Sequence, residues 1–233
     1  MGEVLAMLVE AGADVIELGV PFSDPLADGP TIQRSSHFAI EQGVDLRWTL
    51  DALSAFRAQH DTPVVVFSYL NPIVHFGVER FIAEAGAAGA DGVLITDLPV
   101  GYDAEWEKAF ERSPLDLVRL VAPTTRPERV RTIAERAQGF LYYVSRTGVT
   151  GARQSLAEGL AREVAALRVV SHVPVAVGFG ISTPEQARTV AAVADGVVVG
   201  SALVETLANG GVQAADRLMR GLRGAMPRVG EAA

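Results

Sequence analysis

The chain has 233 residues, of which 49% are apolar, with a formal net charge of −8 and no cysteine. The acidic balance argues against nucleic acid as a partner, because neutralising phosphates requires clustered Lys and Arg. No stretch approaches the roughly 18 uncharged apolar residues of a membrane-spanning helix, and the lack of cysteine excludes disulfides, thiolate nucleophiles and cysteine-based metal sites.

Parallel α/β barrels use about 200 to 250 residues as one unit. We therefore expect a single phosphate-binding domain over residues 1–233. The start, MGEVLAMLVEAG, lacks the basic region and long apolar core of a secretory signal, which favours a cytoplasmic location.

Seven short apolar runs, bounded by Gly, Pro or Asp, alternate with longer segments of helical periodicity. This alternation is typical of repeated βα units and a parallel sheet. Strands that are covered on both faces lose their polar alternation, so the near-continuous apolarity of the runs fits a barrel. The predicted strands are 14–20, 63–69, 92–97, 116–122, 140–145, 174–178 and 196–200.

Amphipathic helices are predicted before and between these runs. Pro127 and Pro184 stand where the first turn of a helix tolerates proline. Three helix-to-strand junctions, AGADVIEL, AGADGVLI and VADGVVVG, repeat one pattern, in which a small residue and an aspartate lead into a strand. The predicted helices are 3–11, 78–88, 126–137, 157–168 and 184–194.

An eight-stranded barrel needs one more strand than these runs supply, and the chain opens directly with a helix. We therefore expect a (β/α)8 TIM barrel of the α/β class whose first strand is not in this chain. A sheet with open edges exposes backbone groups along a seam. We also expect the upstream DNA to encode about thirty further residues, including one apolar strand, in line with the usual barrel length.

Glu17 stands inside VIELGV, an otherwise apolar strand, where an unpaired ionised carboxylate costs several kcal/mol. The strand period places it near the C-terminal strand ends, where barrels of this class carry their active sites. Burial there raises the pKa of a carboxyl group, which suits a general acid or base near neutral pH. The alternative is an ion pair with an arginine from a neighbouring strand end, Arg119 or Arg146.

The loop PFSDPLADGP presents Asp24 and Asp28 between prolines over the same strand end. Two carboxylates in different surroundings take different protonation roles. Asp28 is the stronger catalytic candidate. For Asp24 the alternative, capping of a turn or of the helix that begins near Thr31, carries equal weight.

The segment ELGVPFSDPLADGPTIQ at 17–33 resembles the signature of the tryptophan synthase alpha subunits. Further matching segments follow in order, so the resemblance covers nearly the whole chain. They are FSYLNPI at 67–73, TDLP at 96–99, LVAPTT at 120–125, YVSRTGVTG at 143–151, GFGIS at 178–182 and VVGSALVE at 198–205.

The resemblance implies a lyase of tryptophan biosynthesis, which splits indole-3-glycerol phosphate into indole and glyceraldehyde 3-phosphate by retro-aldol cleavage. It implies no cofactor and no metal on this chain, and an α2β2 heterotetramer with a beta subunit that binds pyridoxal phosphate and receives the indole. By resemblance, Glu17 and Asp28 match the catalytic carboxylates, Tyr142 lies near the substrate, and Thr150, in a loop that closes over substrate, contacts the catalytic aspartate.

Phosphate binding is predicted at the last two strand ends. Barrel enzymes hold phosphate with backbone N–H groups of these loops and a helix start, and GFGIS and GSALV occupy those places. Gly180, Gly200, Ser201 and, in the preceding loop, Gly151 allow the backbone to approach an anion closely, although glycine also serves ordinary tight turns. The aromatic side chains of Phe22 and Phe179 either line an indole pocket or simply pack at the barrel mouth.

Two other functions remain open. The histidines lack ligand spacing, which counts against metal-dependent epimerase barrels, and the only lysine, Lys108, lies in a charged helix, which counts against Schiff-base aldolases. Another phosphosugar isomerase or synthase of tryptophan synthesis is the second enzymatic interpretation. The third is a weakly active or inactive partner that activates a beta subunit, since a pocket-lining strand is missing.

Overall fold

Short apolar segments form seven parallel strands in the computed structural model of the chain, which describes residues 1–145, 153–178 and 180–226. The strands are hydrogen-bonded in sequence order. They are β1 (Ile16–Gly19), β2 (Val64–Ser68), β3 (Gly92–Ile95), β4 (Asp116–Val121), β5 (Leu141–Val144), β6 (Val175–Gly178) and β7 (Gly196–Val198). Each predicted run contains one of them and is up to two residues longer at either end.

Helices follow or precede each strand, and all five predicted helices are present. Pro127 and Pro184 are the first residues of their helices, as predicted. The last helix bends at Gly211, whose φ of 68° interrupts the helical backbone. The helices are α1 (Gly2–Glu10), α2 (Pro30–Glu41), α3 (Leu46–Arg57), α4 (Leu70–Phe76), α5 (Val78–Ala87), α6 (Ala104–Glu111), α7 (Pro127–Glu135), α8 (Arg153–Val170), α9 (Pro184–Ala191) and α10 (Ser201–Ala225).

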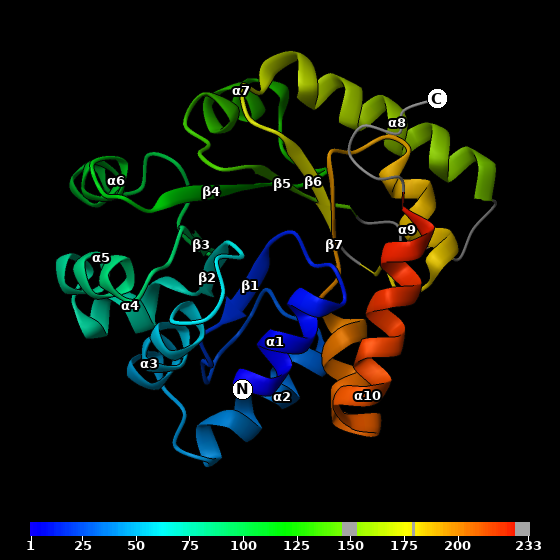
Figure 1. Cartoon of the computed structure of the whole chain (residues 1–233). Helices are drawn as coiled ribbons and strands as arrows, with labels where there is room; N and C mark the ends of the chain where they lie inside the picture. Colours follow the sequence, from blue (N-terminus) through cyan, green and yellow to red (C-terminus); the bar gives the residue numbers. More distant parts are fainter. Residues whose placement is uncertain (146–152, 179, 227–233) are drawn as a thin grey trace. The chain divides into compact units, whose positions relative to one another are not determined.

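The chain divides into two compact units, Met1–Val118 and Arg119–Ala233, and the boundary falls inside β4 (Figure 1). In the first unit, β3 pairs with the first half of β4. In the second unit, the other half of β4 pairs with β5. The prediction of a single domain over 1–233 stays a prediction. In the described part of the chain, no helix is long and apolar enough to cross a membrane.

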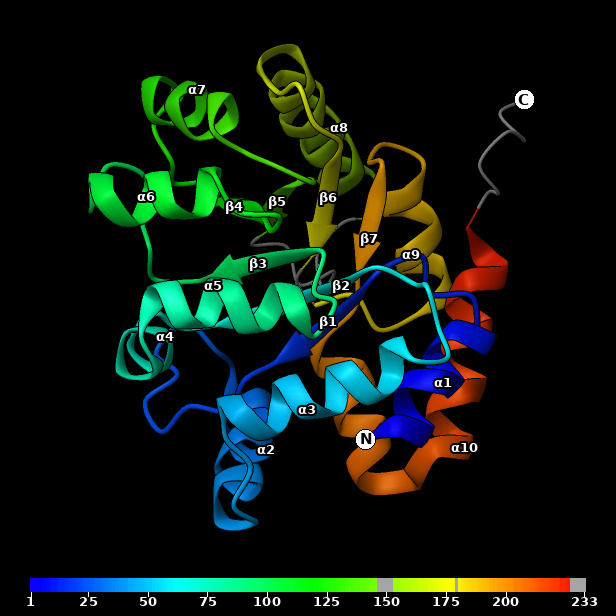
Figure 2. The same cartoon turned by 60° about the vertical axis from the view of Figure 1, so that its left-hand side comes forward.

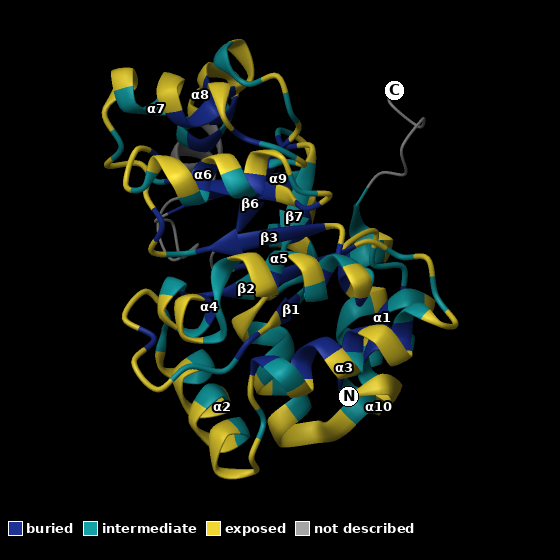
Figure 3. Ribbon diagram, turned by 90° about the vertical axis from the view of Figure 1, so that its left-hand side faces the viewer, coloured by how far each residue is buried: buried dark blue, intermediate teal, exposed yellow. Residues whose placement is uncertain are grey.

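In the first unit α5 lies along β3, with α3 below it (Figure 2), and α1, α3 and α5 all contribute buried residues to the core. All four residues of β3 are buried. Phe81 of α5 and Phe110 of α6 are fully buried and meet edge to face, with ring centroids 6.3 Å apart. By contrast, α2 has no buried residue (Figure 3), and its Phe38 side chain is exposed. The first unit therefore derives its apolar core from α1 and from the helices that follow α2, not from α2 itself.

The core of the second unit is built on β6, all of whose residues are buried. Val164 of α8, Ala187 of α9 and Ala215 of α10 are fully buried as well. A capping box begins α9: Thr183 accepts the N–H of Gln186, and the Gln186 side chain accepts the N–H of Thr183. Such reciprocal capping satisfies backbone donors at the helix start.

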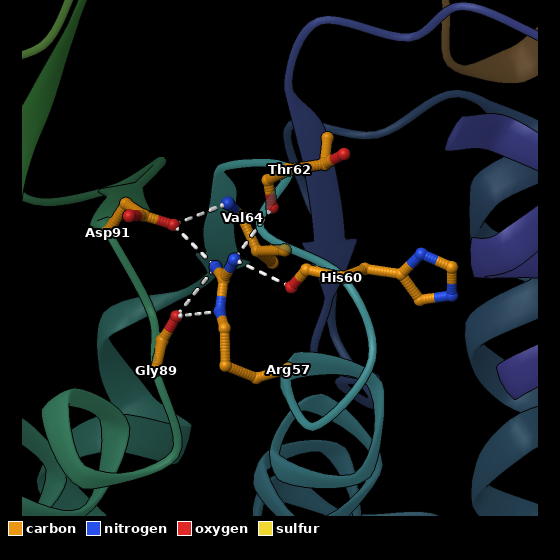
Figure 4. A network of polar contacts seen from close by, with 6 residues as sticks. All are labelled: Arg57, His60, Thr62, Val64, Gly89 and Asp91. Atoms are coloured by element: carbon orange, nitrogen blue, oxygen red, sulfur yellow. Dashed lines mark hydrogen bonds and ion pairs between the residues drawn. The ribbon is translucent and has the colours of Figure 1, made fainter. Parts of the chain in front are cut away.

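The guanidinium group of Arg57 links the end of α3 to the segment that leads into β3 in the first unit (Figure 4). The Arg57 guanidinium donates to the carbonyl oxygens of Gly89, His60 and Thr62 at 2.8 to 3.2 Å. It also pairs with Asp91 at 2.7 Å, and the same Asp91 oxygen accepts the N–H of Val64, the first residue of β2. Asp91 belongs to the second repeated junction. At this junction the aspartate links the end of α3 to the first residue of β2.

The third repeated junction has the same construction in the second unit. Arg168 of α8 pairs with Asp195, and Asp195 accepts the N–H of Val175, the first residue of β6, at 2.8 Å. Burial acts to raise the pKa of Asp195, but the bonds from Arg168 and Val175 outweigh it and hold the pKa below its ordinary value. At both junctions the aspartate joins a preceding strand to a helix end.

We expect Arg57→Lys to lower the free energy of unfolding by about 2 kcal/mol, nearly as much as Arg57→Ala. Lysine keeps the charge but lacks the planar fork, so backbone carbonyls lose their donors and each such loss costs about 1 to 3 kcal/mol. Urea unfolding measures the change. Arg34→Ala, on exposed α2, is the control and changes stability by less than about 0.5 kcal/mol. Wild-type stability of Arg57→Lys would show that charge alone suffices.

Candidate active site

Glu17 is the second residue of β1, between the buried Ile16 and Leu18, and pairs in register with Val65 of β2. The residue as a whole is partly exposed, but its Oε1 is buried and has no hydrogen-bond partner among the described residues. Burial raises the pKa of Glu17 from 4.5 to about 7, and no arginine among the described residues contributes to the shift. Near neutral pH this carboxyl group therefore exists in both protonation states and can act as an acid and as a base. Arg146, one of the two proposed pairing partners, lies outside the described residues.

Asp28 ends a stiff loop that follows β1. Its N–H donates to the carbonyl of Pro25 at 3.0 Å, and its own carbonyl accepts the side chain of Gln33 at 2.9 Å. Its Oδ2 accepts a hydrogen bond from the Tyr69 hydroxyl at 2.9 Å. Burial raises the pKa of Asp28, and the bond from Tyr69 opposes that rise without cancelling it. Both predicted carboxylates thus belong to the first unit, one on β1 and the other on the loop that leaves it.

Two side chains from other elements anchor this loop. Ser36 of α2 accepts the N–H of Phe22 at 2.7 Å and donates to the Phe22 carbonyl at 2.9 Å. Tyr69, directly after β2, accepts the N–H of Ala27 at 2.9 Å. The rings of Phe22 and Tyr69 pack with centroids 5.3 Å apart. The loop is therefore held at both ends, and Phe22 is packed against Tyr69.

Sequence reasoning did not single out Tyr69 or Ser36. The available signal for Tyr69 was its place in FSYLNPI, at the C-terminal end of a strand next to the strand of Glu17. For Ser36, a serine among other polar helix residues, no signal existed.

The contacts of Asp24 match the turn role that was its alternative. The side chain is exposed and accepts the neighbouring Ser23 hydroxyl at 2.5 Å. Its backbone carbonyl accepts the N–H of Leu26 at 2.9 Å. Both bonds are local and close the turn, whereas the carboxylate of Asp28 is tied to a different strand end.

Tyr142, in the second unit, lies in the middle of β5 opposite Ala176 of β6. Its ring packs directly against the backbone of Gly178, the last residue of β6. A Cβ atom at Gly178 would lie 2.7 Å from Cζ of Tyr142 and still closer to the hydroxyl oxygen. Only glycine leaves this space for the ring, and sequence reasoning assigned no role to Gly178.

The described residues of the predicted phosphate site all belong to the second unit. Gly180 adopts a φ of 72°, a left-handed conformation that favours glycine. Gly200 is the N-cap of α10 and Ser201 its first residue, both are exposed, and no side chain caps the helix. Unsatisfied N–H groups at the start of a helix attract anions. Thr150, Gly151 and Phe179, also predicted, lie outside the described residues.

We expect Gly178→Ala to lower the free energy of unfolding by about 1 to 3 kcal/mol, the usual cost of overpacking. The added methyl group collides with the Tyr142 ring, which must move. In Tyr142→Ala the collision disappears, so adding Gly178→Ala to that variant costs less than about 0.5 kcal/mol. Urea unfolding of the four proteins gives the coupling energy. Equal costs in both backgrounds would mean that the ring does not occupy this space.

A family model described as tryptophan synthase alpha chain matches residues 1–225. Relatives that carry the name "Tryptophan synthase alpha chain" include those of Geobacter sulfurreducens, 52% identical over 202 residues, and Acidiphilium cryptum, 49% identical over 208 residues. The alignments cover 87% and 89% of this chain, and 76% and 75% of the relatives. The chain thus spans about three quarters of the length of these relatives.

Solved structures give the same result. Tryptophan synthase subunit alpha from Legionella pneumophila is 37% identical with a TM-score of 0.86, and the match covers 97% of this chain and 86% of that one. A tryptophan synthase structure from Mycobacterium tuberculosis is 40% identical with a TM-score of 0.87, with the same coverage. The predicted fold class, an α/β fold of the TIM-barrel type with seven strands in the described residues, is confirmed. The chain belongs to the tryptophan synthase alpha chain family.

Proposed function

We propose that the chain catalyses retro-aldol cleavage of indole-3-glycerol phosphate to indole and glyceraldehyde 3-phosphate, the alpha reaction of L-tryptophan biosynthesis. The observation that carries the proposal is the buried, unpartnered Oε1 of Glu17, with a pKa of about 7, on a strand of a chain from this family. Carboxyl groups with strongly raised pKa values cluster at functional sites, where their protons take part in the chemistry.

Glu17 supplies the proton chemistry. Breaking the bond between indole C3 and the glycerol chain requires a proton on C3 and the removal of another from the adjacent side-chain hydroxyl. The protonated carboxyl group gives its proton to C3, and the resulting carboxylate then accepts the hydroxyl proton as the carbon–carbon bond breaks. A pKa of about 7 lets one residue perform both steps near neutral pH.

Asp28 stabilises the intermediate. Protonation of C3 places positive charge on the indole ring, and a carboxylate that accepts the ring N–H stabilises this charge. Asp28 has its Oδ2 bound to Tyr69, and no described residue donates to its Oδ1. The loop that carries it is held by Ser36 and Tyr69, so the carboxylate is placed before substrate arrives.

The other predicted residues bind substrate. Gly180, Gly200, Ser201 and Gly151 bind the phosphate through backbone N–H groups and one hydroxyl, which accounts for anion binding in an acidic protein. Tyr142 and Phe179 contact the organic part of the substrate. Thr150 is a further substrate-binding residue.

The chain itself needs no cofactor in this reaction, because proton transfer suffices. We propose an α2β2 heterotetramer in the cytoplasm, in which a beta subunit with pyridoxal phosphate receives the indole. The contact surface comprises Ser23–Asp28 and the region around Asn71, Pro72 and Pro99; Asp24 and Asn71 are exposed. An inactive partner is not favoured, since both carboxylates are present in the predicted elements.

The test is release of indole from indole-3-glycerol phosphate by the purified chain, alone and with a beta subunit. We expect release in both cases and faster release with the partner. Binding of the substrate without release of indole would favour another phosphosugar barrel enzyme. Activation of the beta subunit without any release would favour the non-catalytic partner.

A further inference from the structure

The Tyr69 hydroxyl lies at the centre of a small hydrogen-bond group in the first unit. It donates to Oδ2 of Asp28 and accepts the N–H of Ala27, both at 2.9 Å. A hydrogen bond with Thr96, directly after β3, also acts on it. One phenol thus contacts two consecutive residues of the loop after β1 and a residue at the end of β3.

Tyr69 is itself rigidly placed. Only 4% of the residue is exposed, and its backbone forms the N-cap of α4. The Ser68 hydroxyl donates to its carbonyl at 2.9 Å, and the following N–H, of Leu70, donates to Asp97 at 2.6 Å. The ring also packs on Phe22. A tyrosine has only two side-chain torsions. When its ring is buried and its backbone is held, the position of its hydroxyl group is therefore fixed as well.

We propose that Tyr69 is a positioning residue for Asp28: its hydroxyl holds Oδ2 and thereby leaves Oδ1 available for the ring N–H of the substrate. The inference rests on the function proposed above and adds to it a residue that does not take part in the proton transfers. Carboxylates that must accept one defined hydrogen bond work best when a neighbour fixes their orientation.

The bond also favours the charged form of Asp28. Burial alone drives this carboxyl group toward its neutral form, and the Tyr69 hydroxyl is the contact that opposes this. Burial, together with Asp28, raises the pKa of Tyr69 to about 12, so the phenol stays a donor across the neutral range. Among the described residues no other titratable group contributes to the pKa of Asp28, and Glu17 on β1 is shifted by burial only.

Tyr69→Phe tests the inference because it removes the hydroxyl and keeps the ring. We expect kcat for indole release at pH 7 to fall about 10- to 150-fold, the size expected for one hydrogen bond to a charged group. The acid limb of the pH–rate profile moves to higher pH, because Asp28 loses the contact that lowers its pKa. A structural change alone would lower the rate without moving this limb.

Two further variants separate positioning from stability. Tyr143→Phe removes a comparable buried bond, from a tyrosine hydroxyl to Glu163 at 2.8 Å, in the second unit. It controls for the loss of such a bond and keeps kcat within about two-fold. In the Asp28→Asn background Tyr69→Phe causes no further loss, because the two residues act as one unit.

Titration of the Asp28 carboxyl carbon by NMR, without substrate, completes the experiment. We expect a higher midpoint in Tyr69→Phe than in the wild type. If the wild type releases no indole, the proposed function fails, and the titration still decides whether Tyr69 controls Asp28. Equal midpoints, additive losses in the double variant, or wild-type kcat in Tyr69→Phe would each overturn the inference and leave the lyase function in place.

Discussion

Glu17→Gln is expected to lower kcat for indole release by about 100- to 10,000-fold, the range for a general acid and base. Glutamine has nearly the same shape and fits the same place on β1, but it can neither give a proton to indole C3 nor take one from the hydroxyl. Substrate contacts elsewhere remain, so KM changes little. Single-turnover measurements of indole release separate the chemical step from binding.

The matched control is Asp24→Asn, which also neutralises one carboxylate of the 17–33 segment. Its side chain contacts only Ser23 in the described structure, and the isolated chain should keep its rate within about three-fold. Activation of the beta subunit by Glu17→Gln should persist, because the substitution lies inside a strand. A rate within about five-fold of the wild type would remove Glu17 from the mechanism.

The same substitution should change the pH dependence of stability. Below pH 4 Glu17 is protonated in both the folded and the unfolded chain, so its ionisation does not change the free energy of unfolding. As the pH rises from 4.5 to about 7, the unfolded chain loses this proton while the folded chain keeps it, so the wild type loses stability. One pKa unit corresponds to about 1.4 kcal/mol, and the full cost above pH 7 is therefore roughly 3 kcal/mol.

Glu17→Gln lacks this cost. Between pH 4 and pH 8 its free energy of unfolding should gain about 3 kcal/mol relative to the wild type, measured by urea unfolding at each pH. Comparing the stability difference between variant and wild type at the two pH values cancels any pH-independent effect of replacing the carboxyl group with an amide. Glu111→Gln, at the exposed end of α6, is the control and should change by less than about 0.5 kcal/mol. A pH-independent difference for Glu17→Gln would mean that Glu17 ionises in the folded chain as it does in the unfolded one.

Such a variant would be more stable above neutral pH and nearly inactive. This combination is expected where a strained group is kept for function, because the free energy that destabilises the ionised carboxylate is what makes it a usable acid.

The sequence by itself determined the seven strands, five of the ten helices of the described residues, and the family. Runs such as 63–69 and 92–97 are local patterns. Strands that are buried on both faces appear in the sequence as short, nearly continuous apolar segments. Glu17 was found for the same reason, since one carboxylate in such a run is conspicuous. Asp28 followed from its loop and from the resemblance.

Only the tertiary structure decided which side chains act on these residues. Tyr69 is 41 positions from Asp28, and Gly178 lies on a different strand from Tyr142, whose ring it accommodates. Likewise, the carbonyls bound by Arg57 come from β-strand junctions as far as 32 residues away. Pairing at such distances depends on strand register and on the direction of each side chain, which no local pattern encodes. The sequence therefore indicated two candidate catalytic carboxylates, and the fold determined what holds Asp28 in place and what raises the pKa of Glu17.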